Sequence, residues 1–278
     1  MNKVWMITGS NRGLGRAFAE EAVKNGDLVI AGTRRIDEND PFYADSHVLP
    51  VRLDVTDNEQ IRAAVQAGIE EFGRIDYLIN NAGYGMNGAF EETSEKELRD
   101  LFDADYFGMS NMIKAVLPVM RDQHSGRILN ISSQAGMAGA AGCSAYNAAK
   151  FAVVGMSEAL NEELAPFGIQ VAAVCPGSFR TDFRDASSMR HPESAMSEYN
   201  ETAAHNVVKF LRENNHKQTG DPKKAAAFVY RTAQKENMPV HITVGKSCSD
   251  IVKNNLRKSI DEIDSYYTET SDMEYDPE

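Results

Sequence analysis

The stretch VWMITGSNRGLGRAFAEEAV, Val4–Val23, decides how the chain folds. An apolar run is followed by a glycine-rich turn and then by apolar positions at helical spacing. This order predicts a strand, a tight loop and a helix, the context of a nucleotide-binding glycine motif. Gly9 permits the turn, Gly13 lets a pyrophosphate approach the backbone, and Gly15 allows close packing of helix on strand. The alternative is a glycine-rich turn that binds nothing.

The rest of the chain repeats the alternation of strand and helix. Apolar or β-branched runs occur at 28–31, 47–53, 77–79, 127–131, 169–175 and 240–244, and helical patterns cover 59–72, 95–120 and 148–165. Such alternation is typical of an α/β fold with a parallel sheet. We therefore expect a single Rossmann-type, doubly wound sheet of seven parallel strands with helices on both faces. Ligands of such sheets bind at the carboxyl edge of the strands.

A second motif, YNAAK at Tyr146–Lys150, carries the predicted chemistry. Residues four apart share one face of a helix, so the lysine ammonium can lie beside the phenol. A free tyrosine titrates near pH ~10, and a neighbouring cation lowers that pKa toward the range useful for proton transfer. Ser133, after the strand 127–131, can hydrogen-bond the same substrate oxygen. These residues suit the interconversion of a carbonyl and an alcohol, although a lone Tyr/Lys pair is more often a solvated helix face.

The chain resembles the short-chain dehydrogenase/reductase family over about residues 3 to 245. The motifs that carry the resemblance occur in the expected order: TGSNRGLG at Thr8–Gly15, LDVTD at Leu53–Asp57, NNAG at Asn80–Gly83, Ser133, YNAAK, and PGSFRT at Pro176–Thr181. Within the family the chain is most similar to bacterial members related to hydroxysteroid and retinol dehydrogenases. The resemblance implies an enzyme that transfers a hydride between a nicotinamide dinucleotide and a CH-OH group.

The resemblance also implies where the cofactor binds. In the family, the residue that ends the second strand selects the dinucleotide, and here Thr33 is followed by Arg34 and Arg35. Guanidinium groups suit a phosphate dianion, so we expect NADP(H), with NAD(H) as the second option. The alternative is that both arginines are ordinary solvated charges. The expected cofactor-binding residues are Gly9, Asn11, Arg12, Gly13, Leu14, Gly15, Thr33, Arg34, Arg35, Asp54, Val55, Asn81, Ala82, Gly83, Tyr146, Lys150, Pro176, Gly177 and Thr181. Asn81 and Gly83 can instead simply brace the sheet edge.

Asp105 departs from the family pattern and completes the expected catalytic set with Ser133, Tyr146 and Lys150. Relatives usually carry an asparagine here, which holds a helix kink and a water that links the lysine to solvent. An aspartate keeps the acceptor, loses the amide donor and adds a charge. A carboxylate near Lys150 would stabilise the ammonium and partly offset its effect on the pKa of Tyr146. If the alignment is wrong, Asp105 is an ordinary helix residue.

The domain boundaries follow from the same patterns. Residues 1–248 are the expected dinucleotide-binding and catalytic domain, and the polar segment 184–220 is expected to cover the site as a substrate lid. A helix is expected at 249–267, with apolar positions Ile251, Leu256, Ile260 and Ile263 that serve core packing or subunit contact. An acidic tail at 268–278 is expected to be disordered. Met86, Met137, Met189, Met196 and Phe179 can supply an adaptable apolar substrate wall, which favours a steroid or another bulky hydrophobic carbonyl. Met137 and Cys143 lie between Ser133 and Tyr146, where the substrate wall is expected, but they can equally belong to the core.

Composition limits the function further. Forty-one acidic and twenty-nine basic residues leave a net charge of −12, which disfavours nucleic acid and anionic membranes as partners. Three scattered cysteines and the absence of a leader pattern predict a cytoplasmic protein, and the histidine spacing predicts no metal site. We expect a small-molecule carbonyl or alcohol substrate and, from the resemblance, a homodimer or homotetramer formed by the helices over 95–120 and 146–165. The alternatives are a broad reductase of small aldehydes and ketones, and a non-catalytic dinucleotide sensor.

Overall fold

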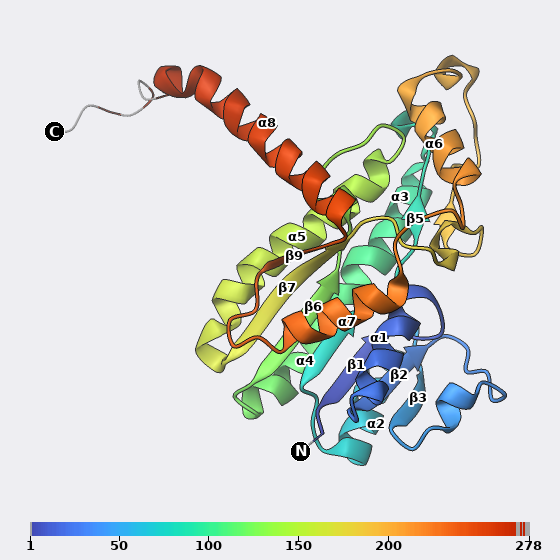
Figure 1. The fold of residues 1–278 in the computed structure, drawn as a ribbon, viewed down its shortest axis with the longest axis vertical. Helices are drawn as coiled ribbons and strands as arrows, with labels where there is room; N and C mark the ends of the chain where they lie inside the picture. Colours follow the sequence, from blue (N-terminus) through green and yellow to red (C-terminus); the bar gives the residue numbers. More distant parts are fainter. Residues whose placement is uncertain (1, 271–272, 274, 276–278) are drawn as a thin grey trace.

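A seven-stranded parallel sheet forms the centre of the molecule (Figure 1). The computed structural model describes residues 2–270, 273 and 275. The strands lie in the order β3-β2-β1-β4-β6-β7-β9. Their bounds are β1 Val4–Thr8, β2 Leu28–Thr33, β3 Val48–Arg52, β4 Tyr77–Asn80, β6 Gly126–Ile131, β7 Ile169–Pro176 and β9 His241–Val244. The order reverses beside β1, where β1 is paired with β2 on one side and β4 on the other. The predicted fold class is confirmed.

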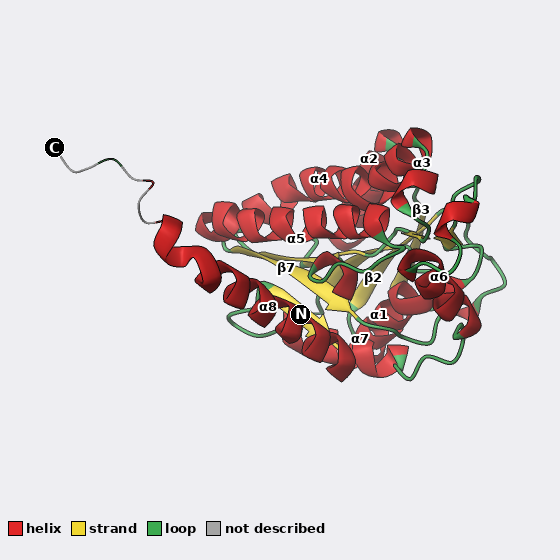
Figure 2. Cartoon of the chain, turned by 90° about the horizontal axis from the view of Figure 1, so that it is seen from above, coloured by secondary structure: helices red, strands yellow, loops and turns green. Residues whose placement is uncertain are grey.

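Helices cover both faces of the sheet (Figure 2). Side chains of a strand alternate between faces, and in β1 Trp5 and Ile7 face one core while Val4 and Met6 face the other. The Trp5 side is covered by α1 and α7, and the Val4 side by α2, α4 and α5. The bounds are α1 Gly13–Lys24, α2 Asn58–Phe72, α4 Gly108–Asp122, α5 Ser144–Leu164 and α7 Pro222–Ala233. This packing fixes the loops at the carboxyl edge from both sides.

The expected helix over 95–120 is interrupted. It consists of α3 (Glu95–Phe102), a π-helical turn (Asp103–Phe107) and α4. Ser94 and Glu97 form a capping box at the start of α3, which satisfies free backbone donors. The π turn inserts one extra residue into the helical repeat, a feature often found at functional sites. Its buried residue is Asp105.

The segment after β7 is tied to the body by a second, two-stranded sheet that the sequence did not predict. In it β5 (Gly85–Met86) pairs with β8 (Met189–Arg190). The segment 184–220, called the lid below, also contains α6 (Ala203–Glu213). The two segments approach closely at Gly85, where a Cβ would lie 2.4 Å from the Met189 methyl carbon and would displace that side chain.

The chain ends in the long helix α8, Lys246–Thr270, which projects from the body (Figure 1). It is longer than expected, because residues 268–270 of the predicted disordered tail are helical. Of the remaining tail, residues 271–272, 274 and 276–278 lie outside the described residues. In the described part of the chain, no helix is both long and apolar enough to cross a bilayer.

Candidate active site

A cavity of about 1130 Å³ opens at the carboxyl edge of the sheet. Its size exceeds the range of ~300–1,000 Å³ common for single small ligands, so it has room for a cofactor and a substrate together. Every residue that the sequence predicted to bind cofactor lines this cavity, with the exception of Gly15. Ser133 lines it as well. Residues from the carboxyl ends of six strands, β1, β2, β3, β4, β6 and β7, therefore meet at one place, as a parallel sheet predicts.

The glycine loop is held in the conformation that a phosphate group requires. Gly9 and Gly13 have φ angles of 67° and 59°, which glycine adopts without strain. A Cβ on Gly15 would lie 2.2 Å from the Gly9 carbonyl oxygen, so Gly15 serves helix packing and does not line the cavity. Because α1 begins at Gly13, its free backbone N–H groups face the cavity and fit a pyrophosphate.

Asn81 braces this loop from the neighbouring strand. Its side-chain amide donates to the carbonyl oxygens of Thr8 (3.0 Å) and Gly9 (3.2 Å). In return, the Thr8 hydroxyl accepts hydrogen bonds from the backbone of Asn81 and Ala82, each at 2.9 Å. The bracing role that the sequence left open therefore accounts for the Asn81 side chain, and the residue also lines the cavity.

Tyr146 and Lys150 lie on one face of α5, beside Ser133. The Lys150 ammonium nitrogen is 5.6 Å from the centre of the Tyr146 ring, and it donates a hydrogen bond of 3.1 Å to the Ile131 carbonyl. Burial raises the pKa of Tyr146 above its ordinary value, while Lys150 and a hydrogen bond with Ser133 act to lower it. Lys150 therefore acts to lower the pKa of Tyr146 as predicted, but burial raises that pKa by more. Tyr146 is therefore protonated at neutral pH, as a proton donor must be.

Asp105 lies behind Lys150, outside the cavity lining. Its side chain is 0% exposed, and its Oδ2 is 3.0 Å from the Lys150 ammonium. Oδ1 accepts the backbone N–H of Tyr84 at 2.9 Å. Burial raises the pKa of Asp105, against the opposing pull of Lys150. Burial alone would lower the pKa of Lys150, but Asp105 and then Tyr146 raise it above its ordinary value. Asp105 is thus placed to act through the lysine and not on a ligand.

Three guanidinium groups surround the far corner of the cavity. Arg34 and Arg35 follow β2, and Arg52 ends β3. Arg52 was not among the predicted cofactor residues, although parallel pairing of the two strands places it opposite Thr33. Arg12, by contrast, points elsewhere: its guanidinium donates to the hydroxyls of Ser187 (2.6 Å) and Ser188 (2.7 Å) in the lid.

The opposite end of the cavity has an apolar wall. Of the five side chains expected there, Phe179 and Met189 line the cavity. The expectation for Met86 and Met196 is wrong for reasons of packing. Met86 lies in the core with Leu101 and Ala145, and Met196 lies in the lid, where its backbone N–H donates to Glu92. Met137, for which the core was the alternative, packs on Val154. The wall is completed by Tyr84, Phe183, Val207 and Leu211, which the sequence did not indicate. Phe183 has its ring 6.2 Å from that of Tyr146.

Asn147 shapes the loop between Ser133 and Tyr146. Its side-chain amide donates to the carbonyl oxygens of Ala135 (2.6 Å) and Ala138 (3.1 Å). Asn147 was not among the predicted site residues, although its position next to Tyr146 in a predicted helix is a usable signal. Cys143, predicted as either substrate wall or core, is buried and also lines the cavity.

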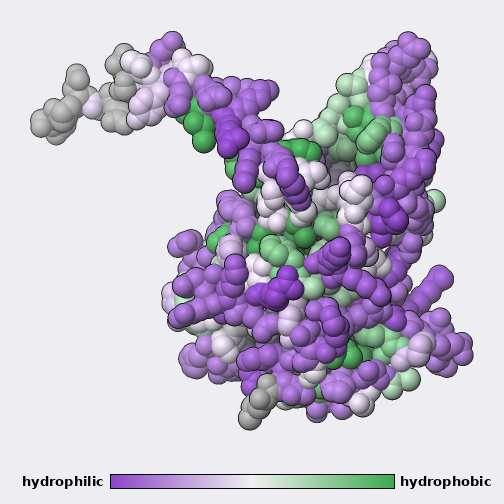
Figure 3. Space-filling model, in the orientation of Figure 1, coloured by the Kyte–Doolittle hydropathy of each residue, from purple (hydrophilic) through white to green (hydrophobic). Residues whose placement is uncertain are grey.

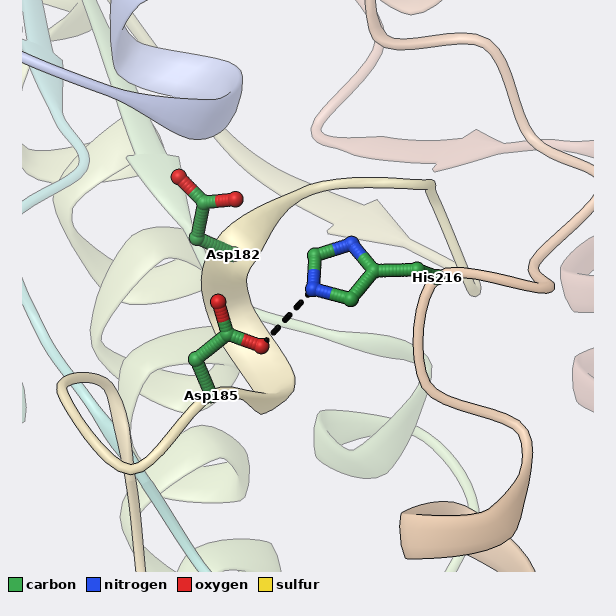
Figure 4. Close-up of side chains that lie close together, drawn as sticks. All are labelled: Asp182, Asp185 and His216. Carbon is green, nitrogen blue, oxygen red and sulfur yellow. Dashed lines mark hydrogen bonds and ion pairs between the residues drawn. The ribbon is translucent and has the colours of Figure 1, made fainter.

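Asp182, Asp185 and His216 meet at the base of the lid (Figure 4). Their ligand atoms lie within 4.8 Å of one another, a cluster that chain spacing could not reveal. Asp185 is already engaged, because it accepts hydrogen bonds from His216 (2.9 Å) and Asn215. These contacts join the two ends of the lid.

Comparison with known proteins identifies the family. The short chain dehydrogenase model matches residues 3–191. Oxidoreductase BOA17 of Botryotinia fuckeliana is 41% identical over 248 residues, covering 88% of this chain and 89% of that protein. A 3-ketodihydrosphingosine reductase of Bacteroides thetaiotaomicron is 37% identical over 245 residues, covering 87% and 88%. The chain belongs to the short-chain dehydrogenase/reductase family of oxidoreductases.

Solved structures agree with this placement. A short-chain dehydrogenase from Streptomyces avermitilis superposes with a TM-score of 0.91 at 38% identity, covering 99% of this chain and all of that one (100%). A family member from Burkholderia phymatum in complex with NAD has a TM-score of 0.78 at 26% identity, covering 91% and 92%. ElxO with NADP bound has a TM-score of 0.71 at 26% identity, covering 88% and 97%.

Proposed function

We propose that this protein is an NADP(H)-dependent oxidoreductase that interconverts a secondary alcohol and a ketone on a bulky hydrophobic substrate such as a steroid. The observation that carries the proposal is the convergence of Ser133, Tyr146 and Lys150 on the cavity that the glycine loop also lines. A bound nicotinamide supplies or accepts the hydride. Tyr146 gives the proton to the carbonyl oxygen, Ser133 orients that oxygen, and Lys150 holds positive charge beside the phenol.

The state of Tyr146 sets the favoured conditions for each direction. Because burial keeps its pKa above the ordinary value, the phenol carries its proton at neutral pH and is ready for ketone reduction. Alcohol oxidation requires the phenolate and is therefore favoured by alkaline pH. The buried surroundings of Tyr146 and Lys150 also exclude water, which strengthens the electrostatic coupling between them.

Replacement of Tyr146 by Phe tests the chemical assignment. The variant keeps the ring and its packing but has no proton to donate. We expect kcat to fall by about 10²- to 10⁴-fold, with the Kd for the dinucleotide nearly unchanged in a fluorescence titration. Near-normal turnover would show that Tyr146 is not the proton donor. A large increase in the Kd for the dinucleotide would show that the substitution damaged the cofactor site instead.

Preference for NADP(H) rests on the basic corner. The solved structures do not distinguish the two cofactors, because one is a complex with NAD and another has NADP bound. Here Arg34, Arg35 and Arg52 line the cavity, and guanidinium groups bind phosphate dianions well. We expect KM for NADPH to be at least about tenfold lower than for NADH, a difference of about 1.4 kcal/mol.

Matched variants separate this preference from general effects. Arg34→Ala and Arg35→Ala are expected to raise KM for NADPH and leave KM for NADH nearly unchanged. Arg121→Ala removes an equally exposed arginine from the opposite end of the sheet, on α4, and is expected to change neither. A clear NADH preference in the parent enzyme would contradict the assignment.

The substrate class follows from the apolar wall and is tested with a panel. Phe179, Phe183, Met189 and Leu211 give that wall an adaptable surface. The relative from Bacteroides thetaiotaomicron, a 3-ketodihydrosphingosine reductase, suggests long-chain ketones beside steroids. NADPH oxidation is measured against steroids, long-chain ketones, small diketones and small aldehydes. Highest kcat/KM on the small carbonyls would support a broad reductase, and inactivity throughout would support a dinucleotide sensor.

A homo-oligomer built on α4 and α5 is part of the proposal. Phe107, the last residue of the π turn before α4, and Phe151 of α5 are 52% and 44% exposed. Large apolar side chains on a smooth helical face favour burial against a second subunit. The dimer and the tetramer are both compatible with this surface.

A further inference from the structure

The part of α8 beyond the body carries an exposed apolar stripe. Leu256, Ile260, Ile263 and Tyr267 are 48%, 56%, 48% and 68% exposed. Their spacing of four, three and four residues places them within one narrow face of a helix, in the a and d pattern of a coiled coil. The face continues outward from Val252, which is buried against the body. Figure 3 shows apolar surface on this projecting helix amid polar surroundings.

Charge along α8 is divided between its two halves. Apart from Asp250, which pairs with Lys246 at 2.6 Å, the charges up to residue 258 are basic and those after it are acidic. The basic half holds Lys246, Lys253, Arg257 and Lys258, and the acidic half holds Asp261, Glu262, Asp264 and Glu269. A parallel neighbour of the same sequence would place like charges together. An antiparallel neighbour would place each basic half beside an acidic one.

We propose that α8 pairs with α8 of a second copy of this chain, antiparallel and around a two-fold axis. In the register that buries the stripe, Ile260 of each copy packs against Ile263 of the other, and Leu256 packs against Tyr267. Arg257 and Asp264 lie on the same flank of the stripe. In an antiparallel pair, this flank of one helix lies beside the same flank of the other helix. Arg257 of each copy therefore meets Asp264 of the other, twice by symmetry. The interface is separate from the outer faces of α4 and α5.

Sedimentation of the full-length protein tests the pairing. The chain has a mass of 30.7 kDa, and Ile260→Asp places two like charges at the centre of the pair. We expect this variant to halve the mass of the assembly, with the Kd of pairing raised about a hundredfold or more. Ser265→Asp is the matched control, because it adds the same charge on the opposite side of the helix and is expected to leave the mass unchanged.

Mixing two charge-reversal variants tests the antiparallel register. Arg257→Glu and Asp264→Arg are each expected to weaken pairing about tenfold, since both symmetric contacts become repulsive. When the two variants are mixed, both contacts become attractive again, and pairing is expected to return to the parent level. A helix pair in parallel register would show no such recovery.

The proposal is overturned if Ile260→Asp sediments like the parent, or if the mixture stays as weak as the single variants. In the first case, pelleting with lipid vesicles decides whether the stripe belongs on a membrane surface instead. In the second case, pairing is real but its direction is wrong. Circular dichroism of each variant confirms that α8 remains helical, so that a lost helix is not mistaken for a lost contact.

Discussion

A carboxylate directly behind the lysine changes the charge that Tyr146 experiences. Asp105 raises the pKa of both Lys150 and Tyr146, because it stabilises the ammonium and repels the phenolate. In this position it does not touch the cavity, so its effect on catalysis passes through Lys150. Gly83 makes room for it, since a Cβ there would lie 2.9 Å from the Asp105 carboxylate. We propose that Asp105 is a positioning residue for the proton transfer.

Asp105→Asn is expected to move the pH profile of kcat for alcohol oxidation toward lower pH. The amide oxygen can still accept the Tyr84 N–H, but the negative charge is lost, so the pKa of Tyr146 falls. The expected shift is on the order of one pH unit. Asp103→Asn, an exposed change on the same π turn, is the control and is expected to leave the profile in place. Superimposable profiles for parent and Asp105→Asn would end the argument that Asp105 senses the lysine.

At the scale of elements, the lid depends on one buried carboxylate. Glu92 accepts hydrogen bonds from the backbone N–H of Ala89 and of Met196 and from the His205 ring, each at 2.8 Å. Met196 and His205 belong to the lid, so Glu92 holds two of its parts at once. Burial acts to raise the pKa of Glu92, but the hydrogen bonds, led by Met196, bring it below its ordinary value. The carboxylate is therefore stabilised in the folded state.

Glu92→Gln is expected to loosen the lid. Loss of a charged acceptor with three partners costs about 1–3 kcal/mol, which corresponds to about 5- to 150-fold faster proteolysis within the lid, since cleavage follows local opening. The contribution of Glu92 is complete above its unfolded pKa of about 4.3 and is lost as the pH falls through its lower folded value. Parent and variant should therefore converge in strongly acidic buffer.

The neighbouring Glu91 supplies the control for this prediction. It is exposed and accepts a hydrogen bond from the Tyr199 hydroxyl at 2.8 Å. Both glutamates lie in a short 3₁₀ helix, Phe90–Glu92, so Glu91→Gln removes the same charge from the surface of that helix. We expect its proteolysis rate to match that of the parent within about twofold, as surface changes have small effects. Equal rates for all three proteins would show that the lid does not depend on Glu92.

At the scale of the whole molecule, the sheet was predictable because each strand is bounded by its own local signals. Apolar runs and glycine turns are patterns of consecutive residues, so they can be recognised without knowing the fold. Parallel pairing of the strands then brings the predicted cofactor residues to the carboxyl edge of the sheet. The features that the sequence could not reveal all depend on distant contacts. The sequence around Met86 suggests a pocket residue, but in the fold its side chain packs in the core with Leu101. Arg52 lies at the site because β3 pairs with β2 in the register that sets Arg52 opposite Thr33.

The projecting helix shows the same limit. Its apolar spacing predicted a helix with one buried stripe, but periodicity does not say which surface covers that stripe. Val252 is buried against the body, whereas Ile260 and Ile263 lie beyond it. The pattern of residues therefore predicts an apolar face, and only the tertiary fold shows which part of that face the body covers.

Net charge and local charge have opposite signs at the cofactor site. The chain carries −12 overall, which repels any dinucleotide, yet the corner at Arg34, Arg35 and Arg52 attracts a phosphate at short range. Overall repulsion acts on NADH and NADPH alike and cancels in the ratio of their KM values. If these arginines hold the additional phosphate as proposed, the basic corner acts mainly on NADPH, and salt screens it because the arginines are exposed.

The ratio of KM for NADPH to KM for NADH is therefore expected to rise several-fold as ionic strength increases from about 0.05 M to about 0.5 M, where the screening length drops well below ~10 Å. In the double variant Arg34→Ala/Arg35→Ala the ratio should start higher and change little with salt, because the groups being screened are gone. Initial rates over this salt range, with both cofactors and both proteins, make the measurement. A parent ratio that stays constant with salt would mean that contacts other than exposed charge select the cofactor, and the basic corner would lose its assigned role.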